Sequence, residues 1–493
     1  MERKSGLLMH ITSLPSNYGI GTMGDEARRF VDFLSFSKQT YWQILPLCQT
    51  GFGNSPYQSC STFAGNPYLI DLDYLYQDGL LKKKEYSQIK WTSKRNQVDY
   101  DIMFEHRYEV LRIAVKRFFS NNDLKEYDSF INNNTWIEDY SLFMALKHHQ
   151  KERGLTKWRK EYKKRNEKTI NNFIKKNQEE INFWKGVQFI FFKQWFSLKE
   201  YANKKGIKII GDCPIYVSLD SSDVWTNPSL FQLDEDLNPI KVAGCPPDYF
   251  NKNGQLWGNP LYNWNNHKKQ NYDWWIKRIN HFSTIYDYVR IDHFRGLAGY
   301  YSVNAKEKTA KNGKWELGPD KTFIETILSK TNNKIIAENL GFMTFDVIDL
   351  LKYSGYPGMN VLEFGFSKYE FKDNENAPIN IKQNSVAYIG THDNEPLLGW
   401  VNTLNNEDYN FLKEYLGVHR KNEIQWKMIE CLWSLKSDTV ILQAQDLLGL
   451  GHKARMNTPS TTTGNWMWRC RRGVFSKELG NKLKQLTIEY KRT

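Results

Sequence analysis

The chain has 493 residues, of which 40% are hydrophobic, and a formal net charge of +13. This length allows one large barrel with insertions or two to three domains. No apolar run reaches the roughly 18 residues that a membrane span needs, so we expect no membrane-spanning helix. The positive charge suggests nucleic acid, but the lysines are spread out and densest over residues 147–176, where acidic residues also occur. That pattern is typical of a solvated face, and we expect no nucleic-acid partner.

The N-terminus and the cysteines indicate the compartment. The opening stretch MERKSGLLMHITSLP has a basic start, but its apolar run is broken at His10, so a signal peptide is not expected. Six cysteines without a CxxC spacing predict neither a disulfide framework nor a zinc site. A reducing, cytoplasmic compartment fits this usage.

Residues 6–16 predict a first strand that runs into a loop, with His10 either lining the end of the strand or packed in the core. The next stretch, GIGTMG from Gly19, matches a dinucleotide-binding fingerprint between a strand and a helix. The long loop before it, and the lack of an acidic residue at the end of a second strand, disfavour that function. Asp25 is the expected N-cap of a helix that runs to Leu34.

A second strand is predicted within residues 41–50, and a long Gly-, Ser- and Tyr-rich loop follows it. Long ordered loops are often functional, so Tyr57 in this loop either stacks on a ligand or anchors the loop. Residues 73–185 are charged and helical in pattern, which predicts a helical insertion after the second strand. A helix then leads through Gly206, a favourable residue after a helix end, into a third strand over residues 208–214.

Residues 218–264 are crowded with Asp, Asn, Gly, Pro and Trp and predict little regular structure. A loop of this length beside a strand end is expected to be a lid or a cleft wall. A plain surface excursion would not explain why Trp225, Trp257 and Trp264 all occur in it.

The rest of the chain alternates helices and strands. Eight candidate strands start near residues 6, 42, 208, 287, 334, 360, 386 and 439. Most are separated by helical stretches, which predicts a (β/α)8 TIM barrel, an α/β fold, as one catalytic domain over residues 1–493. The helical insertion is expected after the second strand, and long loops are expected over the mouth, the opening at the carboxyl ends of the strands.

The segment DYVRIDHFRG, residues 287–296, reads as a buried strand that ends in charged residues. Arg290 and Asp292 are two apart and therefore share a face. An arginine there would keep Asp292 ionised by lowering its pKa, which suits a nucleophile. An ion pair that only holds a loop is the alternative.

Acidic residues end four of the predicted strands: Asp212, Asp292, Glu338 and Asp393. A barrel brings these ends into one mouth. Carboxylates in an aromatic-rich cleft favour glycoside chemistry, in which one attacks the anomeric carbon and another protonates the leaving oxygen. Metal binding is the second candidate. Arg290, together with His392 beside Asp393, weakens it, and no metal or cofactor is expected.

Several sequence blocks resemble those of the 4-α-glucanotransferases, also called amylomaltases or disproportionating enzymes, of glycoside hydrolase family seventy-seven. The blocks are GDCPIYVSLDSSDVW, VAGCPPDYF, GQLWGNPLYNW, RIDHFRG, GTHDN and DLLGLG-x-x-ARMNTP-x-T-x-x-GNW. They occur in the family's order over nearly the whole chain. RIDHFRG alone would indicate only the wider α-amylase clan, whereas the loop over residues 255–264 and the GNW block are specific to this family.

The resemblance implies a retaining, double-displacement transfer between α-1,4-glucans or maltooligosaccharides. It makes Asp292 the nucleophile, Glu338 the general acid and base, and Asp393 the third carboxylate, which holds the donor sugar. The other implied substrate contacts are Tyr57, Asp212, Trp257, Arg290, His293, His392 and Asn465.

Two positions depart from the family pattern, and two functions remain as alternatives. Asn339 stands where the family usually has Asp, and Cys213 replaces a larger apolar residue. Water could attack the glucosyl-enzyme in place of a sugar, so an α-1,4-glucan hydrolase is the alternative. A glucan-binding protein without turnover is a third hypothesis, which the intact carboxylates oppose.

Overall fold

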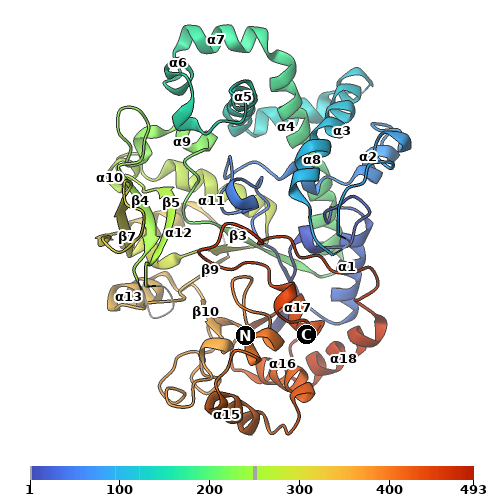
Figure 1. Ribbon diagram of the computed structural model, residues 1–493, viewed down its shortest axis with the longest axis vertical. Coiled ribbons are helices and arrows are strands. Elements are labelled where there is room, and N and C mark those ends of the chain that lie inside the picture. Colours follow the sequence, from blue (N-terminus) through green and yellow to red (C-terminus); the bar gives the residue numbers. More distant parts are fainter. Residues whose placement is uncertain (1–2, 95, 122, 248–251, 333) are drawn as a thin grey trace.

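Eight parallel strands close into a barrel in the computed structural model, which describes residues 3–94, 96–121, 123–247, 252–332 and 334–493 (Figure 1). Around the barrel the order is β1, β12, β11, β10, β9, β6, β3 and β2. The strands are β1 (Lys4–Leu8), β2 (Tyr41–Gln43), β3 (Lys208–Cys213), β6 (Tyr288–Ile291), β9 (Ile335–Ala337), β10 (Gly358–Val361), β11 (Ser385–Tyr388) and β12 (Thr439–Gln443). The predicted barrel and all eight predicted strands are confirmed.

Several strands are shorter than the sequence predicts. β11 ends at Tyr388 rather than near residue 394, and β12 ends at Gln443, where the helix α17 (Ala444–Leu447) begins. Just after β11, a Cβ at Gly390 would lie 2.9–3.1 Å from atoms of Glu363, Asn394 and Gln443, so the chain has room only for glycine at this position. Asp292, Glu338 and Asp393 therefore lie after the ends of β6, β9 and β11 rather than in these strands.

Helices surround the barrel. They are α1 (Asp25–Phe36), α8 (Gln178–Lys204), α11 (Asp273–Ile285), α12 (Asp320–Lys330), α13 (Phe345–Ser354), α14 (Leu397–Val401), α15 (Asn406–Leu416), α16 (Ile424–Ser434) and α18 (Lys477–Glu489). Gly206 follows α8 with φ of +81°, as predicted for the residue after a helix end. The N-cap prediction for α1 is wrong by one residue: Gly24 is the N-cap, and Asp25 is the first helical residue.

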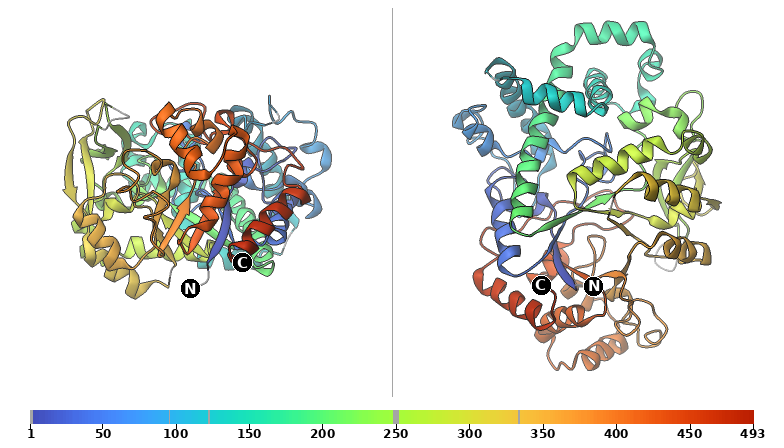
Figure 2. Two further views of the ribbon diagram at one scale, coloured as in Figure 1. Left: turned by 90° about the horizontal axis from the view of Figure 1, so that it is seen from below. Right: turned by 180° about the vertical axis from the view of Figure 1, so that it is seen from behind.

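The residues after β2 form a group of helices at one end of the molecule. They are α2 (Leu72–Gln77), α3 (Tyr100–Asn121), α4 (Lys125–Asn133), α5 (Trp136–His149), α6 (Lys160–Lys163) and α7 (Glu167–Lys176). Figures 1 and 2 show α6 and α7 at the end opposite α15 and α16. α8 runs unbroken from this group to the start of β3, so its 27 residues include the predicted boundary at residue 185.

A second sheet corrects the prediction that residues 218–264 have little regular structure. This stretch contains α9 (Ser222–Thr226), β4 (Lys241–Cys245) and β5 (Gln255–Pro260). β7 (Gly299–Asn304) and β8 (Lys314–Leu317) complete an antiparallel sheet in the order β5, β4, β7, β8. Its strands are short, and β4 pairs with a strand more than 50 residues away, so local patterns did not reveal them. Residues 248–251 of the predicted lid lie outside the described residues.

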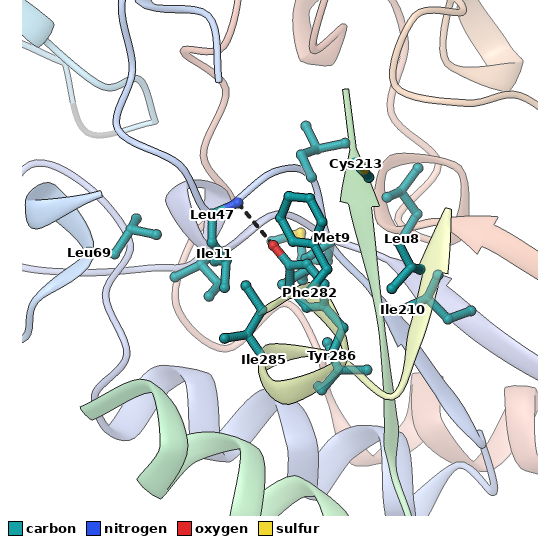
Figure 3. Close-up of a cluster of buried hydrophobic side chains, with 14 of the residues drawn as sticks. Leu8, Met9, Ile11, Leu47, Leu69, Ile210, Cys213, Phe282, Ile285 and Tyr286 are labelled. Atoms are coloured by element: carbon teal, nitrogen blue, oxygen red, sulfur yellow. Dashed lines mark hydrogen bonds between the residues drawn. The ribbon is translucent and has the colours of Figure 1, made fainter. Parts of the chain in front are cut away.

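The core beside β3 shows how the barrel wall is packed (Figure 3). Ile210 and Cys213 of β3 lie in a cluster with Phe282, Ile285 and Tyr286 from the end of α11. A Cβ at Gly211 would lie 2.2 Å from the Tyr286 ring, so glycine is required for this close approach. The buried Tyr286 hydroxyl also accepts a hydrogen bond from the backbone N–H of Leu47, at 3.3 Å.

These contacts pack β3, which carries Asp212, against the end of α11. Within the residues that the structure describes, no helix combines the length and apolar character that crossing a membrane requires.

Candidate active site

Asp292 and Glu338 directly follow β6 and β9, which are paired neighbours in the barrel. Glu338 Oε2 accepts a hydrogen bond of 2.6 Å from the backbone N–H of His293, the residue after Asp292. Its Oε1 accepts one of 2.7 Å from the backbone N–H of Leu340. The carboxyl group of Glu338 is therefore held one residue away from Asp292, at the same end of the barrel.

The turn after β6 is shaped around Glu338. His293 has a left-handed backbone, with φ of 51° and ψ of 48°, which is uncommon for a residue other than glycine. This conformation directs the His293 N–H to the Glu338 carboxylate, and the N–H of Phe294 donates to the Glu338 carbonyl oxygen at 2.9 Å. Backbone strain of this kind clusters at functional sites.

The buried guanidinium of Arg290 joins two carboxylates. Its Nη1 donates to both oxygens of Asp212, at 2.8 and 2.7 Å, and to Oδ1 of Asp292 at 3.0 Å. The side chains of Arg290 and Asp212 are 5% and 1% exposed, whereas that of Asp292 is 28% exposed. Asp292 is therefore the member of this group that a ligand in the mouth can reach.

The ionisation of Asp292 differs from the prediction. Burial raises the pKa of Asp292 well above its usual range, and Arg290 is the strongest opposing influence. Nearby Asp212, Glu338 and Asp393 raise it further. The prediction that Arg290 secures a low pKa for Asp292 is thus corrected: one guanidinium, shared with Asp212, does not offset burial.

A series of contacts leads from Arg290 to the third acid. The Tyr57 hydroxyl donates to Asp212 Oδ2 at 2.7 Å and lies 2.9 Å from His392 Nε2. That same nitrogen lies 3.5 Å from Asp393 Oδ1. Residues from four loops or strands are thereby linked, and the predicted acids Asp212, Asp292 and Asp393 lie around one mouth.

Burial keeps the histidines of the mouth neutral. It lowers the pKa of His293 to about 3 and that of His10 to about 3, and it also lowers the pKa of His392. His10 lies two residues after the end of β1, and His392 contributes to the lowering of its pKa, so His10 lies near the carboxyl end of that strand, toward the mouth. Neutral imidazoles both donate and accept hydrogen bonds, which suits sugar hydroxyls.

Glu338 also has a raised pKa, because it is buried. Arg290 and the two backbone hydrogen bonds to its carboxylate oppose this effect. A carboxylic acid that holds its proton at higher pH is suited to general acid catalysis.

Aromatic rings border the same group. Tyr57 stacks on His392 with ring centroids 5.5 Å apart, and Trp466 lies 5.7 Å from Tyr57. Trp257, on β5, meets the ring of His293 edge to face at 4.9 Å. Trp466 was absent from the predicted site, although it is the last residue of the GNW block that the sequence identified.

The side-chain hydrogen bonds of Asn465 lie within its own loop rather than with the other predicted site residues. Its amide donates to the carbonyl and hydroxyl oxygens of Thr461, at 3.0 Å each, and its Oδ1 accepts from the Thr458 N–H at 2.9 Å. These bonds close the loop over residues 458–465. In this structure Asn465 therefore shapes that loop, and its side-chain bonds are to the loop rather than to the three acids.

The two departures from the family pattern have different surroundings. Asn339 Oδ1 accepts a hydrogen bond of 2.5 Å from the backbone N–H of Met359, which ties the end of β9 to β10. Cys213 is completely buried at the end of β3, and its carbonyl oxygen accepts from the Asp292 N–H at 3.0 Å. Across the described residues, no three His, Cys, Asp or Glu side chains are arranged to hold a metal ion.

Comparisons with known proteins agree with one another. The family model described as 4-alpha-glucanotransferase matches residues 9–475. A 4-alpha-glucanotransferase of Clostridium butyricum is 46% identical over 488 residues, which is 98% of this chain and 100% of that protein. One from Aquifex aeolicus is 42% identical over 480 residues, or 97% of each chain.

Solved structures show the same likeness. The amylomaltase from Streptococcus agalactiae in complex with acarbose superposes with a TM-score of 0.98 at 43% identity and covers 100% of both chains. The amylomaltase from Corynebacterium glutamicum has a TM-score of 0.77 at 16% identity, over 98% of this chain and 75% of that one, which shows a shared fold.

Proposed function

The chain belongs to the 4-alpha-glucanotransferase family, and we propose that it transfers α-1,4-glucan segments through a covalent glucosyl-enzyme on Asp292. Donor and acceptor are maltooligosaccharides or longer glucans, with glucose as the smallest acceptor. The observation that carries this proposal is the hydrogen bond from His293 to Glu338, which holds an acid beside the nucleophile.

In the first step, Asp292 attacks the anomeric carbon of the donor sugar. The bond from that carbon to the Asp292 oxygen forms as the glycosidic bond breaks, and Glu338 gives its proton to the departing oxygen. The two carboxyl groups must therefore hold one proton between them, on Glu338. Arg290 favours this arrangement because it donates to Asp292 directly.

In the second step, the 4-hydroxyl of an acceptor glucan attacks the same carbon. The bond to Asp292 breaks, the new glycosidic bond forms, and Glu338 takes up the proton of the attacking hydroxyl. The anomeric configuration is inverted twice and so retained. Asp393 and the neutral His392 hold hydroxyls of the donor sugar during both steps.

The partners and location follow from the same proposal. α-Glucans are the partners, and a cytoplasmic location agrees with six cysteines that lack a disulfide spacing. The loop over residues 458–465 and the described part of residues 218–264 are proposed to border the mouth and to exclude water from the glucosyl-enzyme.

Incubation with maltotriose tests the function. Transfer gives a ladder of longer chains together with glucose and maltose, whereas the alternative, a hydrolase, only shortens the substrate. The Asp292→Asn variant should lose both outcomes. A protein that only binds glucan would show no turnover in either form, and that result would contradict the proposal.

A further inference from the structure

The stretch that follows α17 folds back onto the third acid. Its helical turn, His452–Ala454, leads into Arg455 and Asn457, within the block ARMNTP. Neither residue was among the predicted site residues. Both contact the segment over residues 392–395, which carries Asp393.

Asn457 makes two bonds to that segment. Its side-chain amide donates to Asp393 Oδ1 at 2.6 Å, and its backbone N–H donates to the carbonyl oxygen of His392 at 3.1 Å. The Asp393 side chain is 44% exposed, and His392 Nε2 lies farther from the same carboxylate oxygen, at 3.5 Å. Asn457 is thus the main restraint on the orientation of this carboxylate.

Arg455 donates hydrogen bonds to the backbone of both Asn457 and Asp393. Its Nε donates to the Asn457 carbonyl oxygen at 2.8 Å, and its Nη2 donates to the Asp393 carbonyl oxygen at 2.8 Å. Its Nη1 pairs with Glu395 Oε2 at 2.7 Å, and the other Glu395 oxygen lies 2.7 Å from His452 Nδ1. Arginine suits this role because its planar fork binds three oxygens at once.

We propose that Asn457 is a positioning residue for Asp393: it occupies Oδ1 and so turns the other oxygen toward the donor sugar. Arg455 and Glu395 keep Asn457 in place. An asparagine fixes the carboxylate without neutralising it, which leaves its full charge for the sugar. This inference rests on the proposed role of Asp393 and extends it.

The variant Asn457→Asp tests the proposal, because it keeps the shape of the side chain and replaces the donor by an anionic acceptor. Misplacement of a contacting group by about 1 Å costs about 100-fold in rate, so we expect kcat on maltotriose to fall roughly 10- to 100-fold, with KM nearly unchanged. Two adjacent carboxylates resist simultaneous ionisation, so the acidic limb of kcat/KM should move to higher pH by about one unit.

Three further variants make the result specific. Asn171→Asp adds the same charge on the exposed face of α7 and should leave activity and pH profile unchanged. Asn457→Ala should lower kcat without moving the acidic limb of the kcat/KM profile. Transfer and hydrolysis should fall in the same proportion in both Asn457 variants, because Asp393 holds the donor sugar in the same way whether a sugar hydroxyl or water attacks. The third variant, Asp393→Asn, removes the charge of the third acid itself and should abolish turnover.

The outcomes separate the inference from the proposed function. If Asp393→Asn is inactive while Asn457→Asp keeps wild-type kcat and pH profile, the positioning role is refuted and the function stands. If Asn457→Asp chiefly raises the share of hydrolysis, the residue shapes the water-excluding loop, and the positioning role is again refuted. If Asp393→Asn remains fully active, the proposed function itself fails.

Discussion

Replacing Arg290 by Met tests the electrostatic core of the site. The change keeps much of the length of the side chain but removes a cation that touches Asp212 and Asp292. Burial then acts unopposed on Asp292, so its pKa should rise further. Since Asp292 must be ionised to act as the proposed nucleophile, the acidic limb of kcat/KM should move to higher pH.

The magnitude follows from the geometry. Arg290 Nη1 and Asp292 Oδ1 are 3.0 Å apart, and at an effective dielectric constant of about 20 their attraction is about 5.5 kcal/mol. That energy equals about four pKa units and is an upper bound, because water that enters the space restores part of it. We expect a shift of about 1–3 units. Leaving buried Asp212 unpaired should also lower the free energy of unfolding by about 3–5 kcal/mol.

Initial rates on maltotriose between pH 4 and pH 10, with thermal unfolding of the same samples, measure both effects. Arg290→Lys is the matched control: it keeps the charge, and its limb should lie between those of the wild type and Arg290→Met. An unchanged limb in folded Arg290→Met would refute the claim that Arg290 lowers the pKa of Asp292.

Three other predictions concern single groups. Tyr57→Phe removes the hydroxyl that donates to Asp212 at 2.7 Å and should lower kcat about tenfold on maltotriose, as expected for a bond of about 1.5 kcal/mol; unaltered kcat would contradict this. Asn339→Asp adds a negative charge beside Glu338, so the pKa of Glu338 should rise and the basic limb of kcat should move to higher pH. A limb that stays in place would show that the charge is screened. Burial raises the pKa of Asp446 to about 7, so the free energy of unfolding should fall as pH rises from about 4 to about 7. Asp446→Asn should remove that fall, as measured by urea titrations at both pH values. If the fall persists in the variant, burial does not govern the ionisation of Asp446.

The barrel was predictable because its strands are local and apolar. β12 reads TVILQ and β11 reads SVAY, and both are almost completely buried. Parallel barrel strands are covered on both faces, which gives continuous apolar runs that a sequence shows directly. The acids were found for the same reason, since each one follows such a run.

The second sheet was not predictable from local pattern. β4 and β8 have five and four residues, and β5 contains Gly258 and Pro260, which usually mark turns. β4 pairs with β7, which begins more than 50 residues later in the chain. Only the tertiary contacts identify these segments as strands.

The effect of burial on the pKa values of the site residues could not be judged from the sequence. The spacing of Arg290 and Asp292 correctly indicated their contact, but not that Asp212 accepts two of the three hydrogen bonds that Arg290 Nη1 donates. Likewise, Asn457 and Trp466 lie in recognised blocks, yet their contacts with Asp393 and Tyr57 depend on how a loop more than 60 residues away folds back.

The most direct test is to trap the glucosyl-enzyme in the Glu338→Gln variant. With α-maltotriosyl fluoride as donor, the leaving group needs no proton, so the first step proceeds, whereas the second lacks its base and the adduct accumulates. Mass spectrometry of peptides from the acid-quenched sample should find one maltotriosyl group on Asp292. An adduct on another carboxylate, or free maltotriose at full rate with no adduct, would contradict the assignment of Asp292 as nucleophile and Glu338 as base.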